Sequence, residues 1–208
     1  HKNHHSTWSF NIKEDYLSSF VIRVMQDKFG LKCSELIRPK KHLREVIVNN
    51  TVFGDWIVAF CGKGSEHKKL KEEVMQWPIE LQKYILLGYL AGDGHVGKIT
   101  NGQSAYSYMA ASISVDLRDQ MYSIGINCGY SPKIRMQKHG GRRVRDSYWI
   151  YFIGNSAVEL SSLNGIPFKD KNTGETVEPM RQSYMRNIIE CSNYSCVKIS
   201  QIWTEKYD

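Results

Sequence analysis

The chain begins with two contrasting hydrophobic patterns. Residues 7–12 alternate apolar and polar side chains, which is the period of a half-buried β-strand. Residues 13–29 carry apolar side chains at a helical spacing instead, and Gly30 follows as a stop signal. The apolar positions of this expected helix are Leu17, Phe20, Val21, Val24 and Met25. The pattern therefore predicts a strand followed by an amphipathic helix.

The same order of elements occurs twice. The first half continues with a basic loop (38–44), a strand-like run (45–48), the capping pair Asn50-Thr51 and a helical stretch (52–61) that ends at Gly62. The second half has, in order, a strand-like run (108–114), a helical stretch (116–128), a basic hairpin (133–145), a strand (148–153), the pair Asn155-Ser156 and a helix (157–163). Its first helix places Leu117, Met121, Ile124 and Gly125 on one face. This repetition predicts an internal duplication within an α+β fold.

Positive charge is concentrated in the two basic segments. The chain has 28 Lys+Arg against 21 Asp+Glu, a formal charge of +7. The stretch 133–145 has no acid around the turn signal Gly140-Gly141, and its basic residues are Lys133, Arg135, Lys138, Arg142, Arg143 and Arg145. The earlier loop contributes Arg38, Lys40, Lys41 and Arg44. Two-stranded basic ribbons fit the major groove of duplex DNA, although a solvated basic surface is the alternative.

Composition excludes several classes of protein. Hydrophobic residues make up 41% of the chain, which is too many for a disordered segment, and no apolar run is long enough to span a bilayer. The five cysteines are irregularly spaced, which favours a reducing, intracellular setting over a disulfide framework. We expect an intracellular protein that binds no membrane.

A further helix is expected between the two repeats, from Pro78 to the stop at Gly94. Gly88 and Gly92 lie one turn apart in it, and each glycine costs about 1 kcal/mol relative to alanine, so close approach of another helix is the expected compensation. Asp93 ends the helix, where the helix dipole disfavours a carboxylate. A divalent cation would balance this charge; a simple Asp-Gly turn is the alternative.

Residues 86–94 read LLGYLAGDG, which resembles the signature of LAGLIDADG homing endonucleases. The upstream block (62–70), with Trp77-Pro78 and residues 80–82, is similar to the segment before the second motif in intein-encoded members. Lys71 departs from the proline usual there. The resemblance implies an α+β fold of two αββαββα repeats, with saddle-shaped antiparallel sheets and motif helices that meet at a pseudo-twofold interface.

The resemblance also implies an activity. The family consists of site-specific endonucleases that hydrolyse both strands of double-stranded DNA with divalent metals. On that pattern Asp93 and Gly92 would bind Mg²⁺ or Mn²⁺, and Lys68 would lie near the scissile phosphate. Lys169 or Lys171 would be its equivalent in the second repeat. The expected state is a monomer with an internal pseudo-twofold repeat.

The expected domains are residues 1–77, a first repeat lacking its motif helix; 78–168, a second repeat that begins with the motif helix; and 169–208. The last segment is expected to hold a helix (184–190) and a strand, as in intein-encoded members whose chain returns to a splicing domain. The second metal-binding acid is expected upstream of residue 7, in a longer chain. Alternatively, a helix from another chain would supply this acid. The alternative function is that of a non-cleaving DNA-binding regulator or RNA maturase on the same scaffold.

Overall fold

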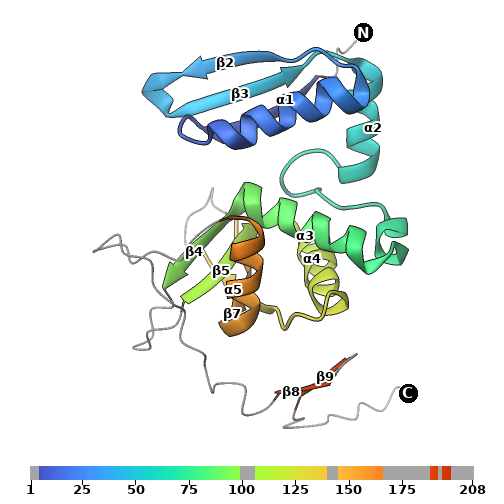
Figure 1. The fold of residues 1–208 in the computed structure, drawn as a ribbon, viewed down its shortest axis with the longest axis vertical. Helices are drawn as coiled ribbons and strands as arrows, with labels where there is room; N and C mark the ends of the chain where they lie inside the picture. Colours follow the sequence, from blue (N-terminus) through green and yellow to red (C-terminus); the bar gives the residue numbers. More distant parts are fainter. Residues whose placement is uncertain (1–4, 99–105, 140–144, 166–187, 192–193, 198–208) are drawn as a thin grey trace. The chain divides into compact units, whose positions relative to one another are not determined.

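The computed structural model describes residues 5–98, 106–139, 145–165, 188–191 and 194–197. The chain divides into two compact units, residues 1–71 (unit 1) and 72–208 (unit 2). Figure 1 shows both, and each is described by itself. None of the helices in the described ranges is long and apolar enough to cross a membrane.

Unit 1 is a three-stranded antiparallel sheet with two helices. Its elements are β1 (Ser6–Asn11), α1 (Asp15–Phe29), β2 (Ser34–Arg38), the 3-10 turn η1 (Pro39–Lys41), β3 (Leu43–Val48) and α2 (Thr51–Cys61). The strand order is β1-β3-β2. Gly30 ends α1 in the left-handed region at φ 64°, and the Asn50 side chain caps α2 by accepting a hydrogen bond from the Phe53 amide. The predicted strand, helices and stop signals of this half are confirmed.

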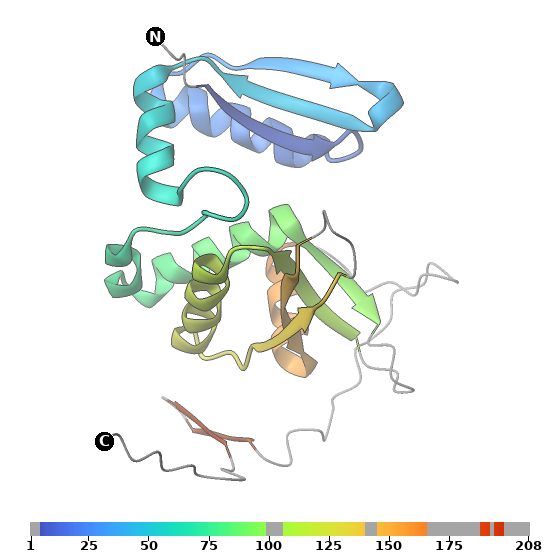
Figure 2. The ribbon, with the colours of Figure 1, turned by 180° about the vertical axis from the view of Figure 1, so that it is seen from behind.

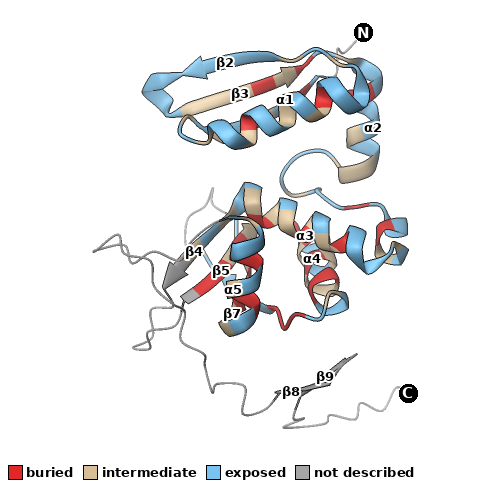
Figure 3. Ribbon diagram, in the orientation of Figure 1, coloured by how far each residue is buried: buried red, intermediate tan, exposed pale blue. Residues whose placement is uncertain are grey.

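One face of this sheet packs against the helices. Val48 on β3, Met25 on α1 and Phe53 on α2 form a buried cluster. Figures 1 and 2 show α1 along that side, and Figure 3 shows β2 exposed along its length. The apolar stripe predicted on α1 is wrong at Phe20, which is 53% exposed. A three-stranded sheet covers only a narrow strip of the helix, and Phe20 lies outside it beneath the Arg23 guanidinium.

Unit 2 has a four-stranded antiparallel sheet in the order β4-β5-β7-β6. Its elements are η2 (Glu72–Gln76), α3 (Ile79–Asp93), β4 (Gly94–Lys98), β5 (Tyr106–Ser112), α4 (Val115–Asn127), β6 (Lys133–Gln137), β7 (Ser147–Ile153) and α5 (Gly154–Leu163), with a separate pair β8 (Ile188–Cys191) and β9 (Tyr194–Val197). The predicted inner face of α4 is confirmed, because all four of its residues are buried. Gly125 of α4 faces the Phe152 ring of β7, where a Cβ would be crowded.

The two units share an order of elements. In unit 2, β5-α4-β6-β7-α5 follows the order of β1-α1-β2-β3-α2 in unit 1. The sheet order β5-β7-β6 likewise matches β1-β3-β2, and unit 2 adds α3 and β4. The motif helix α3 ends at Asp93, as the sequence predicted.

Three local predictions need correction. The cap expected at Asn155-Ser156 is wrong, because Gly154 adopts φ 58° and lets β7 pass straight into α5. The strand expected over 108–114 ends at Ser112, and Ser114 caps α4 instead. The helix expected over 184–190 is wrong at 188–190, which lie in β8; the β-branched pair Ile188 and Ile189 suits a strand. Residues 184–187 lie outside the described ranges.

Candidate nucleic-acid interface and metal site

The end of the motif helix is fixed by a glycine. Asp93 is the last residue of α3, and the chain enters β4 at Gly94 in an extended conformation (φ −91°, ψ 159°) without an intervening loop. A Cβ at Gly94 would overlap the backbone carbonyl of Leu90. Only glycine therefore permits this direct passage from helix to strand.

The Asp93 carboxylate is exposed at the helix C-terminus. It makes no hydrogen bond or ion pair with any residue that the structure describes. The nearby Tyr89 hydroxyl is buried without a hydrogen-bond partner within those ranges. Burial, and secondarily the charge of Asp93, raises the pKa of Tyr89. An exposed carboxylate at the negative end of a helix dipole is a position that a cation would stabilise.

The donor atoms at this position suit a hard divalent cation. Mg²⁺ takes one or two carboxylates, with waters and phosphate oxygens completing the shell. Asp93 would supply one carboxylate, and the Gly92 backbone would add a carbonyl oxygen. The described part of the chain contains no cluster of three or more His, Cys, Asp or Glu side chains that could bind a metal ion. A carboxylate and a carbonyl oxygen are donors of the kind that Mg²⁺ or Mn²⁺ takes, so these two residues fit part of the coordination shell of such a cation.

An apolar face of α3 is uncovered within the described residues. A Cβ added at Gly88 or at Gly92 would meet nothing within 4 Å. Tyr84, one turn before Gly88, is 71% exposed, and Leu81 is 49% exposed. These positions share a helix face by their spacing. The helix contact that the sequence predicted at the two glycines is thus not made inside the described ranges.

Within the described residues, the sheet of unit 2 has one face that no helix covers, and this open face carries basic and aromatic side chains. Helices α3, α4 and α5 contact β5 and β7 from the other side, where Tyr108, Ile150 and Phe152 are buried. Side chains directly opposite in an antiparallel sheet share a face. One open row contains His95, Met109, Tyr151 and Lys133, and the next contains Ala111, Trp149 and Arg135.

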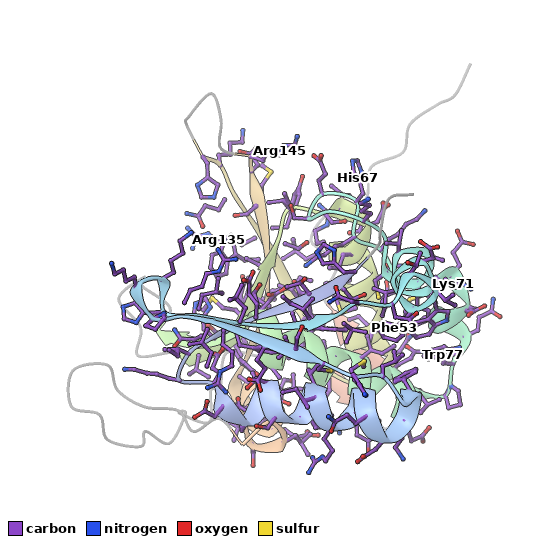
Figure 4. The ribbon with its side chains drawn as sticks, turned by 90° about the horizontal axis from the view of Figure 1, so that it is seen from above. Phe53, His67, Lys71, Trp77, Arg135 and Arg145 are labelled. Carbon is purple, nitrogen blue, oxygen red and sulfur yellow. The ribbon has the colours of Figure 1, made fainter. Side chains whose placement is uncertain are left out.

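These side chains are partly ordered by one another. The Trp149 indole N–H donates to the side-chain oxygen of Gln137 at 2.8 Å. The His95 ring meets the Trp149 ring edge-on, with 5.3 Å between centroids. Lys133 and Arg135 are exposed on β6, and Arg135 and Arg145 both belong to the β6–β7 hairpin (Figure 4). Lys138, also exposed, follows the end of β6.

Unit 1 presents a smaller basic surface. Arg38 on β2 lies on the open face in one row with Leu43 and Asn11. Its guanidinium pairs with Glu45 at 3.1 Å, in the neighbouring row. Lys40 and Lys41 are exposed in η1, which joins β2 to β3. These three basic residues therefore gather at the tip of this hairpin.

Arg44 belongs to the opposite face. It follows Leu43 on β3, so its side chain points toward the helices. Its guanidinium contacts Asp15 of α1 at 2.7 Å and donates to the Ser18 hydroxyl at 3.1 Å. Glu35 lies 3.8 Å away, and the Arg44 side chain is 17% exposed. The structure therefore gives Arg44 a role in joining α1 to the sheet, and Arg44 is not part of the exposed basic surface of unit 1.

The remaining predicted site residues lie elsewhere. Lys68 is exposed in the loop after α2, in unit 1, whereas Asp93 is in unit 2. That loop is closed by the Lys69 amide on the Cys61 carbonyl and the Lys71 amide on the Phe60 carbonyl. Arg142, Arg143, Lys169 and Lys171 lie outside the described residues.

Four residues of the open face were not predicted from the sequence. They are His95, Gln137, Trp149 and Tyr151. The alternation in β7 contained the signal, because Trp149 and Tyr151 fall on one side and Ile150 and Phe152 on the other. Only the strand register showed that Trp149 and Tyr151 share a face with Lys133 and Arg135.

Comparison with known proteins identifies the fold. No family model and no curated protein matches the sequence. Among solved structures, the crystal structure of I-DmoI in complex with DNA and Mn matches with a TM-score of 0.52 and 10% identity, over 76% of this chain and 78% of that one. An I-DmoI variant with its target DNA in the presence of Mg gives 0.52 and 10%, over 77% and 79%. The chain has the fold of I-DmoI, a LAGLIDADG homing endonuclease. At this identity the likeness shows the fold alone, and it confirms the predicted fold class.

Proposed function

We propose that this protein is a site-specific endonuclease that cuts double-stranded DNA with a divalent metal ion. The observation that carries the proposal is the exposed Asp93 carboxylate at the end of the motif helix. It has no cation partner among the described residues, and Gly94 leads directly from it into the sheet. The open face of that sheet carries Lys133 and Arg135. The fold supports the proposal, because I-DmoI was crystallised with DNA and Mn or Mg.

The basic surfaces would hold the duplex. Lys133 and Arg135 would contact phosphates or guanine edges from the sheet of unit 2, and Lys138, Arg142, Arg143 and Arg145 would extend the contact along its hairpin. Arg38, Lys40 and Lys41 would do the same from unit 1. Gln137 has an amide that can pair with adenine, and its hydrogen bond to Trp149 holds it on the open face.

Asp93 and the Gly92 carbonyl would hold the cation. A bound Mg²⁺ or Mn²⁺ supplies Lewis-acid polarisation of the phosphate and activation of the attacking water. Lys68 would bring a positive charge to the developing charge on the phosphate, and Lys169 or Lys171 would do so in the second half. Each of these lysines would favour the transition state over the bound ground state.

A second helix would complete the site. Gly88 and Gly92 leave open space on the exposed face of α3, so another helix backbone can approach closely there. Its own terminal acid would then lie near Asp93 and bring a second carboxylate to the metal site. We propose a monomer with a pseudo-twofold axis at this contact. An intein origin is part of the proposal and rests on the segment upstream of the motif.

The proposal is tested with the wild-type protein on a library of duplexes that carry a randomised insert. In Mg²⁺ or Mn²⁺ we expect cuts at one recurring sequence on both strands, and none in EDTA. Tight binding to a recurring sequence with no cutting in either metal would contradict the nuclease proposal. It would favour the non-cleaving DNA-binding relative instead.

A further inference from the structure

A hydrogen-bond network around the buried Tyr108 side chain holds the last turns of the motif helix. Tyr108 on β5 is fully buried, and its hydroxyl donates to the Leu90 carbonyl of α3 at 2.9 Å. Asn164, which follows α5, donates from its side-chain amide to the Tyr108 oxygen at 2.8 Å and to the Leu87 carbonyl at 3.1 Å. Two backbone carbonyls of α3 are thus held by a side chain from the sheet and by the side chain that follows α5.

The position of this network bears on Asp93. The last carbonyls of a helix lack partners within the helix, and helix ends fray for that reason. Leu90 lies three residues before Asp93, with its own side chain fully buried. Gly94, the residue after Asp93, packs against the same Leu90 carbonyl so tightly that a Cβ would not fit. The backbone of Asp93 therefore lies between Leu90, whose carbonyl accepts the Tyr108 hydrogen bond, and Gly94, which packs against the same carbonyl.

We propose that Tyr108 and Asn164 are positioning residues that set the place of the Asp93 carboxylate for a divalent cation. This inference rests on the proposed function, because it concerns the same site. Mg²⁺ demands near-ideal octahedral geometry, so a ligand that shifts with a fraying helix end binds it poorly. Partners that orient metal ligands typically change metal affinity or activity by 10–100-fold when they are removed.

The simpler interpretation is that the network only stabilises the fold. Tyr130→Phe separates the two interpretations, since Tyr130 is a second buried tyrosine of unit 2. Its hydroxyl donates to a Glu159 carboxylate oxygen at 2.7 Å, and that carboxylate also contacts Lys83 in the first half of α3. Removing this hydroxyl costs a charge-assisted hydrogen bond far along the helix from Asp93.

The experiment measures Mn²⁺ binding by the electron paramagnetic resonance signal of free Mn²⁺. The protein is bound to the tightest duplex recovered from the randomised library. Tyr108→Phe and, as an independent second variant, Asn164→Ala are compared with wild type and with Tyr130→Phe. We expect Tyr108→Phe to weaken Mn²⁺ binding about tenfold, with DNA affinity in EDTA unchanged. Tyr130→Phe should lower the thermal unfolding temperature and leave Mn²⁺ binding at the wild-type value.

The outcomes separate the two proposals. Wild-type Mn²⁺ affinity in both Tyr108→Phe and Asn164→Ala overturns the positioning role and leaves the endonuclease proposal intact. Equal weakening by Tyr130→Phe also overturns it, because general destabilisation would then explain the effect. If Asp93→Asn binds Mn²⁺ as wild type does, the metal site itself is wrong, and the proposed function fails together with this inference.

Discussion

The open face of the unit 2 sheet yields the most quantitative prediction. Replacing both Lys133 and Arg135 by alanine removes two exposed charges from β6, two residues apart on one face. Neither side chain is part of the buried core, so the fold should be unaffected. If this face lies on DNA, the variant loses up to two phosphate contacts.

The size of the effect follows from counterion release. Each phosphate contact contributes about 0.9 to the slope of log K against log salt concentration on B-DNA, so two contacts contribute about 1.8. Between about 50 and 200 mM salt, a fourfold change, that slope corresponds to a factor of about 12 in affinity. Wild type should therefore lose about 12-fold more affinity over this range than the double variant.

The assay is fluorescence anisotropy of a labelled duplex in EDTA at several salt concentrations. The matched control is the double variant Arg23→Ala with Lys28→Ala, which removes the same charge from exposed positions on α1. Both double variants have a formal charge of seven minus two, or +5, so long-range attraction falls equally. Equal salt slopes for the two double variants would refute the placement of DNA on the open face.

Three further predictions concern single residues. Arg44→Ala should lower the free energy of unfolding by about 1.5–3 kcal/mol, which is the range for hydrogen bonds to charged groups. It should leave the salt dependence of DNA binding unchanged. A changed salt slope would show that Arg44 contacts DNA. Gly88→Ala should raise the stability of this chain by about 1 kcal/mol, because its Cβ meets open space; destabilisation in urea unfolding would show that the face is already covered. Burial raises the pKa of Glu159, but hydrogen bonds from Lys83 and Tyr130 outweigh burial and lower this pKa below 4.5. The extra stability of wild type over Glu159→Gln should therefore be full above pH 4.5 and disappear as the pH falls through the lowered pKa. A stability difference that stays constant across acid pH would contradict this.

The order of elements was accessible from the sequence because it depends on local signals. Hydrophobic period and glycine stops give the ends of α1 and α3 within two residues. The inner face of α4 could be predicted because its apolar side chains recur at helical spacing. These features depend on neighbours within one or two turns, which a sequence displays directly.

The face of the sheet on which each side chain lies could not be predicted from the sequence. Arg38 and Arg44 belong to one basic loop in the sequence. Arg38 lies on the open face of the unit 1 sheet and Arg44 lies among the helices, because side chains alternate between the two faces of the sheet. Alternation alone does not say which phase faces the core when charged residues occupy both. The Tyr108–Asn164 network joins residues 56 positions apart, and no local pattern indicates it.

The role that we propose for Asp93 is that of a metal-binding carboxylate in a DNA-cutting site. Its most direct test compares Asp93→Asn with Asp116→Asn, an exposed acid in the first turn of α4, on the duplex that wild type cuts in Mg²⁺. We expect Asp93→Asn to bind this duplex in EDTA with the wild-type affinity and to leave it uncut in Mg²⁺, while Asp116→Asn cuts it as wild type does. Cleavage by Asp93→Asn at the wild-type rate would contradict the account.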